Sequence, residues 1–438
     1  MKRFLILFAL VLGSCACENK PAPDPVPDPT PGPGPVPENA EVRVPFKDSI
    51  THVQPMTGIV LWNTSSSVKK DYVQLEFSYM LYNDVCKEKD VYDWTPMDKL
   101  LEAAATRGHQ VVVRFRYTYP GYASAVPDYI KEMEGYEANW AKADGRSRPD
   151  TEYPDWRCEE LQRFHKEFHR RFAERYDKDP RLAFVETGFG HWAEYHVYDG
   201  LYIKGQTFPS PEFQKEFLPM MDEWFEDTPW LISIDASDRS YGSPFPSTKS
   251  LLDLNFGNFD DSFMCEDWSG YNWSCWKFFG EDRYKRAPAG GEFSYYSSYD
   301  QKHVLDKEGM YGRVFEDVVA KVHMTFIIGN DQPGKQKPER IMEAAMSMGY
   351  RFEVRDFKVK PGETASVLIA NVGVAPIYRD AFVQVEGVRG DLNLRTLMPG
   401  EEAWVTIPCK SSTESRPSIA CDHLVPGQEI QYQADIQE

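Results

Sequence analysis

Residues 181–196 read R-L-A-F-V-E-T-G-F-G-H-W-A-E-Y-H: a short apolar run, two glycines, then an acid among aromatic and imidazole side chains. The run at residues 182–185 is typical of a buried strand, and Gly188 and Gly190 give the backbone the freedom to leave a sheet. In parallel barrels, catalytic carboxylates lie just beyond the carboxyl ends of the strands. The stretch therefore predicts a strand followed by a site that contains Glu194, and the alternative is a loop with a solvated acid.

Strand-like and helix-like segments alternate from residue 45 to residue 349. Short apolar runs are separated by amphipathic segments, such as the one that begins at Thr95 with Pro96 in its first turn. Eight strands are expected, at residues 58–62, 72–79, 110–117, 182–185, 230–235, 251–256, 287–293 and 324–328. Alternation of this kind predicts an α/β fold, a (β/α)8 or TIM barrel.

The pattern changes at residue 350. Short alternating segments at residues 351–359, 364–372, 381–386 and 402–407 are separated by turns such as Pro-Gly. This spacing is typical of a small antiparallel β-sandwich. We therefore expect residues 350–438 to form a second, all-β domain, which contains no cluster of acids or histidines.

The first 44 residues have the features of an export signal and a spacer. Two basic residues precede an apolar run at residues 4–12, and residues 12–15 read L-G-S-C, which is similar to the bacterial lipoprotein signal. This similarity implies a signal peptide over residues 1–14 and lipidation of Cys15. Residues 15–44 then form a proline-rich linker. We expect a protein anchored by lipid in the cell envelope, on the surface or periplasmic face of the outer membrane.

Composition narrows the classes of partner. A net charge of −19 argues against nucleic acid, whereas the aromatic content of 14% suits carbohydrate, whose C–H faces stack on rings. The expected partners are a carbohydrate substrate and, through the lipid, a membrane. The sequence leaves the oligomeric state open.

Neither a cofactor nor a metal site is expected. His165 and His169 are four residues apart on a predicted helix with no third ligand, so a solvated helix face is the preferred interpretation. The eight cysteines include no CxxC pair. Cys265 with Cys275, and Cys409 with Cys421, are the candidate local disulfides.

Residues 45–438 resemble a family of Bacteroides-type lipoproteins of unknown function, which have a glycosidase-like barrel and a C-terminal sandwich. The stretch G-F-G-H-W-A-E-Y-H is similar to that family's Gly-Phe-x-Gly-x-Trp-Gly-Glu-Trp-His signature, with Ala193 and Tyr195 as departures. More remotely, the barrel resembles clan A of the retaining glycoside hydrolases. In that clan the acid/base Glu follows strand four and the nucleophile Glu follows strand seven.

The clan A resemblance implies that Glu194 and Glu292 are catalytic. Glycoside cleavage needs one carboxyl group that donates a proton to the leaving oxygen and a second that attacks or activates water. Burial beside Trp192 and Tyr195 would raise the pKa of Glu194 and suit it to the acid role. Clan A usually has Asn before the acid/base Glu, and here that residue is Ala193.

Strand ends and aromatic loops supply the candidate sugar-binding residues. Glu186, within the strand, is expected to pair with Arg114 or Arg116 instead. Residues 268–279 are a candidate stacking platform, with packing of the loop on its own rings as the alternative. The predicted substrate-binding residues are Trp62, Arg116, Tyr117, Trp192, His196, Asp235, Asn258, Asp260, Trp268, Tyr295 and Asp331.

Two functions follow from these residues. The first is a cell-envelope glycoside hydrolase that uses two carboxylates and a retaining mechanism. The second is a glycan-binding lipoprotein on a barrel that has lost catalysis, which Ala193 favours.

Overall fold

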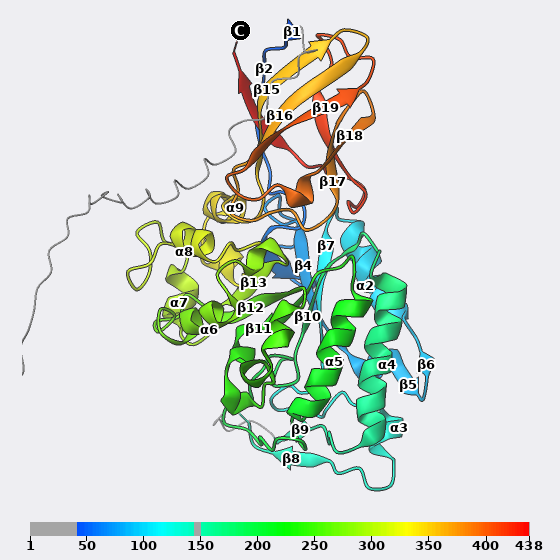
Figure 1. The fold of residues 1–438 in the computed structure, drawn as a ribbon. Coiled ribbons are helices and arrows are strands. Elements are labelled where there is room, and N and C mark those ends of the chain that lie inside the picture. The colour runs from blue at the N-terminus through cyan, green and yellow to red at the C-terminus, as the bar shows by residue number, and fades with distance from the viewer. Residues whose placement is uncertain (1–41, 144–149, 438) are drawn as a thin grey trace, which may run out of the picture. The chain divides into compact units, whose positions relative to one another are not determined.

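The computed structural model describes residues 42–143 and 150–437 (Figure 1). The predicted signal peptide, Cys15 and nearly all of the linker lie outside these residues. Among the helices of the described ranges, none has the length and apolar character needed to cross a bilayer.

Eight parallel strands close into a barrel, which confirms the predicted fold class. In order around the barrel they are β3 (Gly58–Trp62), β4 (Leu75–Leu81), β7 (Gln110–Arg116), β10 (Leu182–Thr187), β11 (Trp230–Ser233), β12 (Phe256–Phe263), β13 (Ala289–Phe293) and β14 (Phe326–Ile328). The barrel closes where β14 pairs with β3, with Phe326 opposite Gly58. Because the strands are parallel, their carboxyl ends meet at one mouth.

The connections between the strands contain helices and two small hairpins. The helices are α1 (Tyr82–Val85), α2 (Thr95–Ala105), α3 (Asp128–Lys131), α4 (Glu159–Tyr176), α5 (Pro211–Trp224), α6 (Tyr271–Phe279), α7 (Ser298–His303), α8 (Phe315–Lys321) and α9 (Pro338–Met346). The hairpins pair β5 (Cys86–Glu88) with β6 (Val91–Tyr92), and β8 (Asn139–Ala141) with β9 (Thr151–Tyr153). Helix α5 begins after Ser210, whose side chain accepts a hydrogen bond from the Phe213 amide.

The sixth strand lies later in the chain than predicted. Residues 251–256 were expected to form it, but Lys249–Asp253 is a 3-10 turn and the strand starts only at Phe256. Leu251 packs in a buried cluster outside the sheet, which accounts for the apolar side chain that made this segment resemble a strand. The shift places Asp260 and Asp261 within β12 instead of after it.

Large apolar side chains from several strands fill the lower part of the barrel interior. Phe184 of β10 and Phe326 of β14 stack with their ring centroids 4.8 Å apart, although their strands lie opposite each other in the barrel order. Leu75, Phe77 and Val112 belong to the same buried cluster. Side chains alternate along a strand, so Tyr79 and Arg114 continue this inward row towards the mouth.

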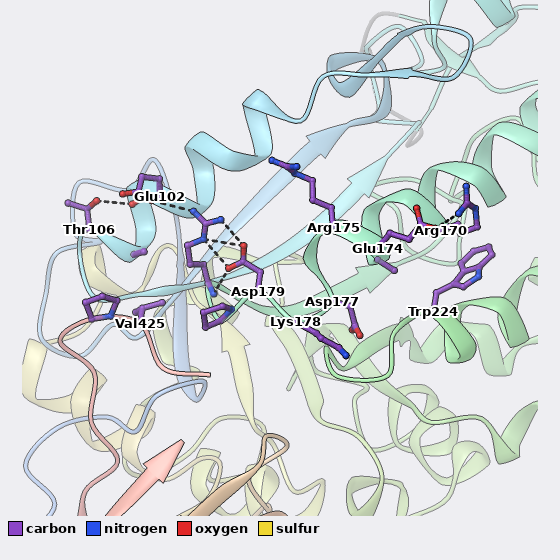
Figure 2. A pocket seen from close by; sticks show the side chains of 15 residues that line it. Glu102, Thr106, Arg170, Glu174, Arg175, Asp177, Lys178, Asp179, Trp224 and Val425 are labelled. Carbon is purple, nitrogen blue, oxygen red and sulfur yellow. Dashed lines mark hydrogen bonds and ion pairs between the residues drawn. The ribbon is translucent and has the colours of Figure 1, made fainter. Parts of the chain in front are cut away.

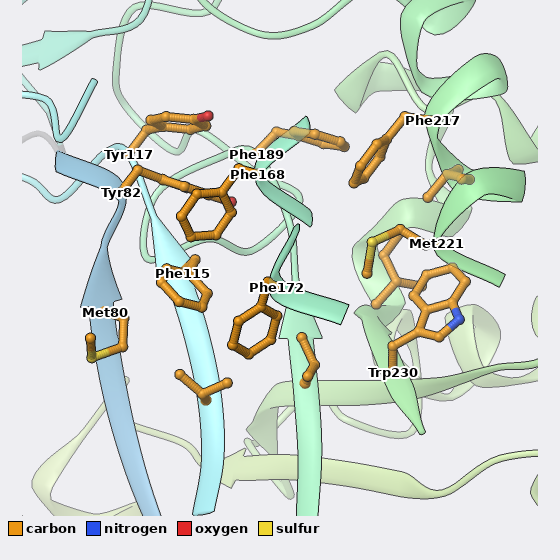
Figure 3. Packing of buried hydrophobic residues seen from close by; sticks show 14 of the residues in the cluster. Met80, Tyr82, Phe115, Tyr117, Phe168, Phe172, Phe189, Phe217, Met221 and Trp230 are labelled. Atoms are coloured by element: carbon orange, nitrogen blue, oxygen red, sulfur yellow. The ribbon is translucent and has the colours of Figure 1, made fainter. Parts of the chain in front are cut away.

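Outside the barrel, α4 and α5 cover β4, β7 and β10 through an aromatic cluster (Figure 3). Tyr117 stacks on Tyr82 at 4.0 Å between centroids, and its hydroxyl lies 3.0 Å from Nδ1 of His165. Tyr117 therefore packs outside the barrel and is not a substrate-binding residue. His165 and His169 are buried, so the expected solvated helix face is wrong as well.

The C-terminal region is a sandwich of two antiparallel-rich sheets. The larger sheet has the order β19 (Glu402–Pro408), β16 (Thr364–Asn371), β15 (Phe352–Lys360), β21 (Tyr432–Ile436) and β2 (Phe46–Asp48). The smaller sheet has the order β18 (Val388–Asn393), β17 (Ala381–Val385) and β20 (Pro417–Cys421). The six cysteines of the described residues are free thiols, so neither candidate disulfide is present.

Two short N-terminal strands belong to the sandwich. Strand β1 (Val42–Arg43) pairs with β15, and β2 pairs with β21. Between them, Val44 is buried and its amide donates a hydrogen bond to the carbonyl of Phe357. The predicted start of the barrel at residue 45 therefore falls too early, because residues 42–48 complete the C-terminal sheet.

Candidate active site

A cavity of about 590 Å³ opens at the mouth of the barrel. Its walls are built from strand ends and from the loops that follow them, and acids and aromatic rings dominate. The lining residues are Trp62, Tyr79, Tyr119, Trp192, Glu194, His196, Tyr198, Ser233, Ile234, Asp235, Asp260, Asp261, Ser262, Tyr271, Glu292, Tyr295, Tyr296 and Asn330.

The loop after β10 folds back on itself to present Glu194. The amides of Phe189 and Gly190 both donate hydrogen bonds to the carbonyl of Glu194, at 3.1 and 2.8 Å. A Cβ at Gly188 would collide with the carbonyl oxygen of Ala193, which explains why glycine stands there. The turn holds Ala193 at φ 58°, in the left-handed region that non-glycine residues rarely occupy. The backbone thus fixes Glu194 at the mouth at a conformational cost.

The Glu194 carboxylate contacts a histidine and an arginine side chain. His196 Nε2 lies 2.6 Å from Oε2, in a hydrogen bond, and Arg114 Nη1 lies 3.6 Å from Oε1. The His196 ring stacks on Tyr198 with centroids 3.8 Å apart, which fixes the imidazole. Glu194 therefore has a defined position before any substrate arrives.

Arg114 organises the floor of the cavity. Its guanidinium donates to Glu186 at 2.7 and 2.9 Å, as the sequence predicted for Glu186, and to Asp261 at 2.9 Å. It also lies 4.3 Å above the ring of Phe259. This arginine is wholly buried, so its charge acts on the acids in a site that excludes water.

Glu292 lies on β13, the seventh strand of the barrel, and lines the same cavity as Glu194. Gly290 and Gly291 precede it on the strand. A Cβ at Gly290 would meet the Phe326 ring, and one at Gly291 would meet the backbone of Asp260. The glycines therefore allow close packing of β13 against its neighbours.

More carboxyl groups gather here than Arg114 neutralises. Burial, followed by the charge of Asp261, raises the pKa of both Glu194 and Glu292 well above the usual range. Burial also raises the pKa of Asp235 to about 7 and that of Asp260 to about 6. The cluster consequently holds protons near neutral pH, because each negative charge opposes ionisation of the next.

Asp260 is held by four donors. The indole nitrogens of Trp268 and Trp276 donate to Oδ2 at 2.8 and 3.1 Å, and Asn272 donates to Oδ1 at 2.7 Å. The amide of Ser262 adds a bond of 3.1 Å to Oδ1. Trp268 and Trp276 therefore support an acid from behind rather than forming the predicted stacking platform, and Trp268 does not line the cavity.

Aromatic rings form one continuous wall. Tyr79 lies 5.7 Å from Trp62 and 6.1 Å from Tyr119, and Tyr119 lies 6.2 Å from Trp192, all measured between ring centroids. Rings presented edge and face in this way suit the apolar faces of sugars. Arg116 stacks behind this wall, 4.6 Å from the Tyr119 ring, and does not line the cavity.

The structure brings together most, but not all, of the predicted site residues. Those that line the cavity are Trp62, Trp192, Glu194, His196, Asp235, Asp260, Glu292 and Tyr295. Asn258 is buried on the other side of β12, where it donates to the Ile232 carbonyl. Asp331 does not line the cavity, but it contacts the lining residue Tyr295. Burial, followed by the charges of Glu292 and Asp331, raises the pKa of Tyr295.

Several lining residues were not among those predicted. Tyr79 follows Phe77 at the alternating spacing of one row, but the sequence does not show which row faces inward. Tyr119, Tyr198, Tyr296 and Asn330 come from loops, where no period marks which face is turned inward.

A second cavity, of about 1060 Å³, lies at the amino end of the strands (Figure 2). Residues 177–181, which precede β10, form one side of it. Its charged groups neutralise one another: Arg181 pairs with Asp179 at 2.7 Å and with Glu102 at 3.3 Å. It therefore lacks the unbalanced acids of the barrel mouth.

Comparisons with known proteins do not assign the chain to a family. Neither a scan against protein-family models nor a search of curated proteins gave a match. Among solved structures, the chain is similar to a GH5_18 protein from Bifidobacterium longum, with 7% identity, a TM-score of 0.42, and coverage of 68% of this chain and 79% of that one. It is also similar to the catalytic domain of a β-amylase from Paenibacillus polymyxa, with 9% identity, a TM-score of 0.43, and coverage of 67% and 99%.

Proposed function

We propose that this protein is a glycoside hydrolase that uses Glu194 and Glu292. The observation that carries the proposal is that the two carboxyl groups follow the fourth and end the seventh strand of one barrel and line one cavity. The aromatic wall from Trp62 to Trp192 gives that cavity surfaces on which sugar rings stack.

The electrostatics support a division of labour between the two acids. Burial and the charge of Asp261 raise the pKa of both acids, and the charge of Glu194 raises that of Glu292 further, so the pair retains a proton while one member ionises. Glu194, which His196 and Arg114 position, is the proposed acid/base. Glu292 is the proposed nucleophile, as the resemblance to clan A implies.

In a retaining reaction, Glu292 attacks the anomeric carbon while Glu194 protonates the departing oxygen. The C–O bond to the leaving group breaks as the bond to Glu292 forms, giving a glycosyl-enzyme. Glu194 then takes a proton from a water molecule whose oxygen attacks the anomeric carbon. The bond from that carbon to Glu292 breaks, which releases the sugar and restores both carboxyl groups.

A panel of aryl glycosides tests this proposal. Glu292→Gln should abolish turnover of an activated aryl glycoside, because the nucleophile is lost. Glu194→Gln should spare turnover partly, since a good leaving group needs little protonation. Asp253→Asn, an exposed acid in the connection before β12, is the matched control and should retain full activity. Turnover by Glu292→Gln at the wild-type rate would contradict the mechanism.

The second candidate is a non-catalytic glycan-binding protein, which the replacement of the usual Asn by Ala193 favours. Binding of an oligosaccharide without turnover by the wild-type protein, together with unchanged binding by Glu292→Gln, would select it.

We also propose that Cys15 carries a lipid anchor and that the barrel acts in the cell envelope. The sequence L-G-S-C at residues 12–15 supports this assignment. Cys15→Ala should move the protein from the membrane fraction to the soluble fraction, and a variant that stays with the membrane would contradict it.

A further inference from the structure

The cavity has an acidic side that the two proposed catalytic groups do not explain. Beyond Glu194 and Glu292, it is lined by Asp235, Asp260 and Asp261, and no lysine or arginine of the described chain joins them in the lining. Arg114 lies behind the floor with its guanidinium already bonded to Glu186 and Asp261. A ligand on this side therefore meets carboxyl groups and no cationic side chain.

One of these acids has an unused oxygen. Asp261 bonds Arg114 through Oδ1, whereas its buried Oδ2 has no hydrogen-bond partner within the described residues. The side chain is only 8% exposed and lines the cavity. A buried acceptor without a donor is costly, so its position indicates that a ligand supplies the donor.

Aromatic rings surround the same acids. Tyr198, Tyr271 and Tyr296 line the cavity together with Asp235. The indole donors from Trp268 and Trp276 hold the buried carboxyl group of Asp260 beside this wall. Carboxylates combined with ring faces form the environment that binds organic ammonium groups.

A metal ion fits this arrangement poorly. Among the described residues, no three His, Cys, Asp or Glu side chains converge as metal ligands do. Asp235 lies in the turn after β11, whereas Asp260 and Asp261 lie on β12. This spread suits a cation carried on a sugar ring rather than a compact ion.

We infer that the glycan taken by this site carries a free amino group, as in a hexosamine, and that its ammonium lies beside Asp235 and Asp261. The inference rests on the proposed function for the sugar ring and adds the class of sugar. An N-acetylated sugar lacks the positive charge, and a uronic acid would be repelled by the acids.

Binding measurements on the full-length protein test this assignment. Glucosamine, galactosamine and mannosamine are each titrated against their N-acetyl counterparts by ligand-observed NMR. At least one amine should bind tenfold or more tightly than its N-acetyl partner, and its affinity should fall as salt is raised. Ethanolamine, which supplies an ammonium without a ring, should bind at least tenfold more weakly than that amine.

Asp235→Asn should abolish the tenfold preference for the amine over its N-acetyl partner. The charge-matched control Asp253→Asn should keep the preference. Equal binding of each amine and its N-acetyl form, or ethanolamine binding as tightly as the best amine, would overturn the inference.

The outcome is separable from that of the proposed hydrolase. Turnover that depends on Glu292, without a preference for amines, would overturn the inference and leave the hydrolase intact. A preference for amines without turnover would support the inference and leave only the glycan-binding function.

Discussion

At the scale of single residues, the acids of the site share very few positively charged or hydrogen-bonding side chains. Arg114 serves Glu186, Asp261 and Glu194, and His196 is the second contact of Glu194. Sequence reasoning found Glu194 and Glu292 because strand order marks both positions. It misplaced Tyr117 and Asn258 because neighbouring residues in a strand face opposite sides, and the sequence does not say which parity faces inward.

His196 is expected to act as a positioning residue for Glu194. Losing a hydrogen bond to a charged group costs about 1.5–3 kcal/mol, which corresponds to about tenfold or more in rate. For His196→Ala, kcat on a glycoside with a poor leaving group should fall by about tenfold, with KM little changed. A dinitrophenyl glycoside should be affected much less, because its departure needs little protonation. His303→Ala, on α7 outside the cavity, is the control, and equal losses on both substrates would contradict the role.

Asp235 should couple stability to pH. Its pKa of about 7 in the folded protein lies above that of an unfolded aspartate, so the folded state binds more protons. The resulting stabilisation is present below about pH 4 and is lost as the pH rises through about 7. Asp235→Asn should therefore unfold at higher urea than wild type at pH 8 and at similar urea at pH 4. Asp253→Asn should show no such pH-dependent difference, and a constant offset for Asp235→Asn would refute the coupling.

At the scale of elements, the loop from β10 to His196 is fixed by backbone geometry. The sequence shows the glycines of this loop. It does not show that the loop folds back onto the Glu194 carbonyl, because that turn depends on Ala193 adopting a positive φ. The sixth strand shows the same limit. Leu251 and Leu252 form an apolar run within a 3-10 turn, whereas β12 contains two acids and does not look like a buried strand.

Gly188→Ala should destabilise this loop. The added Cβ would collide with the Ala193 carbonyl, and overpacking typically costs about 1–3 kcal/mol. The midpoint of urea unfolding should fall, and activity should fall further because Glu194 moves with the loop. Gly334→Ala is a matched control, since a Cβ there meets no atom within 4 Å. Wild-type stability and activity in Gly188→Ala would show that the loop is not constrained as the structure indicates.

At the scale of the whole molecule, two regions distant in sequence complete one sheet. The sequence predicted the barrel and the sandwich because their hydrophobic periods differ. It did not predict that residues 42–48 pair with β15 and β21, since strands of two or three residues carry almost no periodic signal. After the linker, the chain first adds β1 and β2 to the sandwich and then enters the barrel at β3.

Removing residues 1–48 should therefore weaken the sandwich, whereas removing residues 1–41 should not. The longer deletion takes away Val44 and Phe46, and Phe46 packs edge-on against Phe357 and Tyr432 at 6.0 and 6.4 Å between centroids. It also exposes the edge of β21, whose unpaired backbone groups favour association between chains. We expect a lower urea midpoint and concentration-dependent aggregation for the longer deletion only, measured by fluorescence and light scattering. Identical behaviour of the two truncated proteins would show that β1 and β2 add nothing to the stability of the sheet.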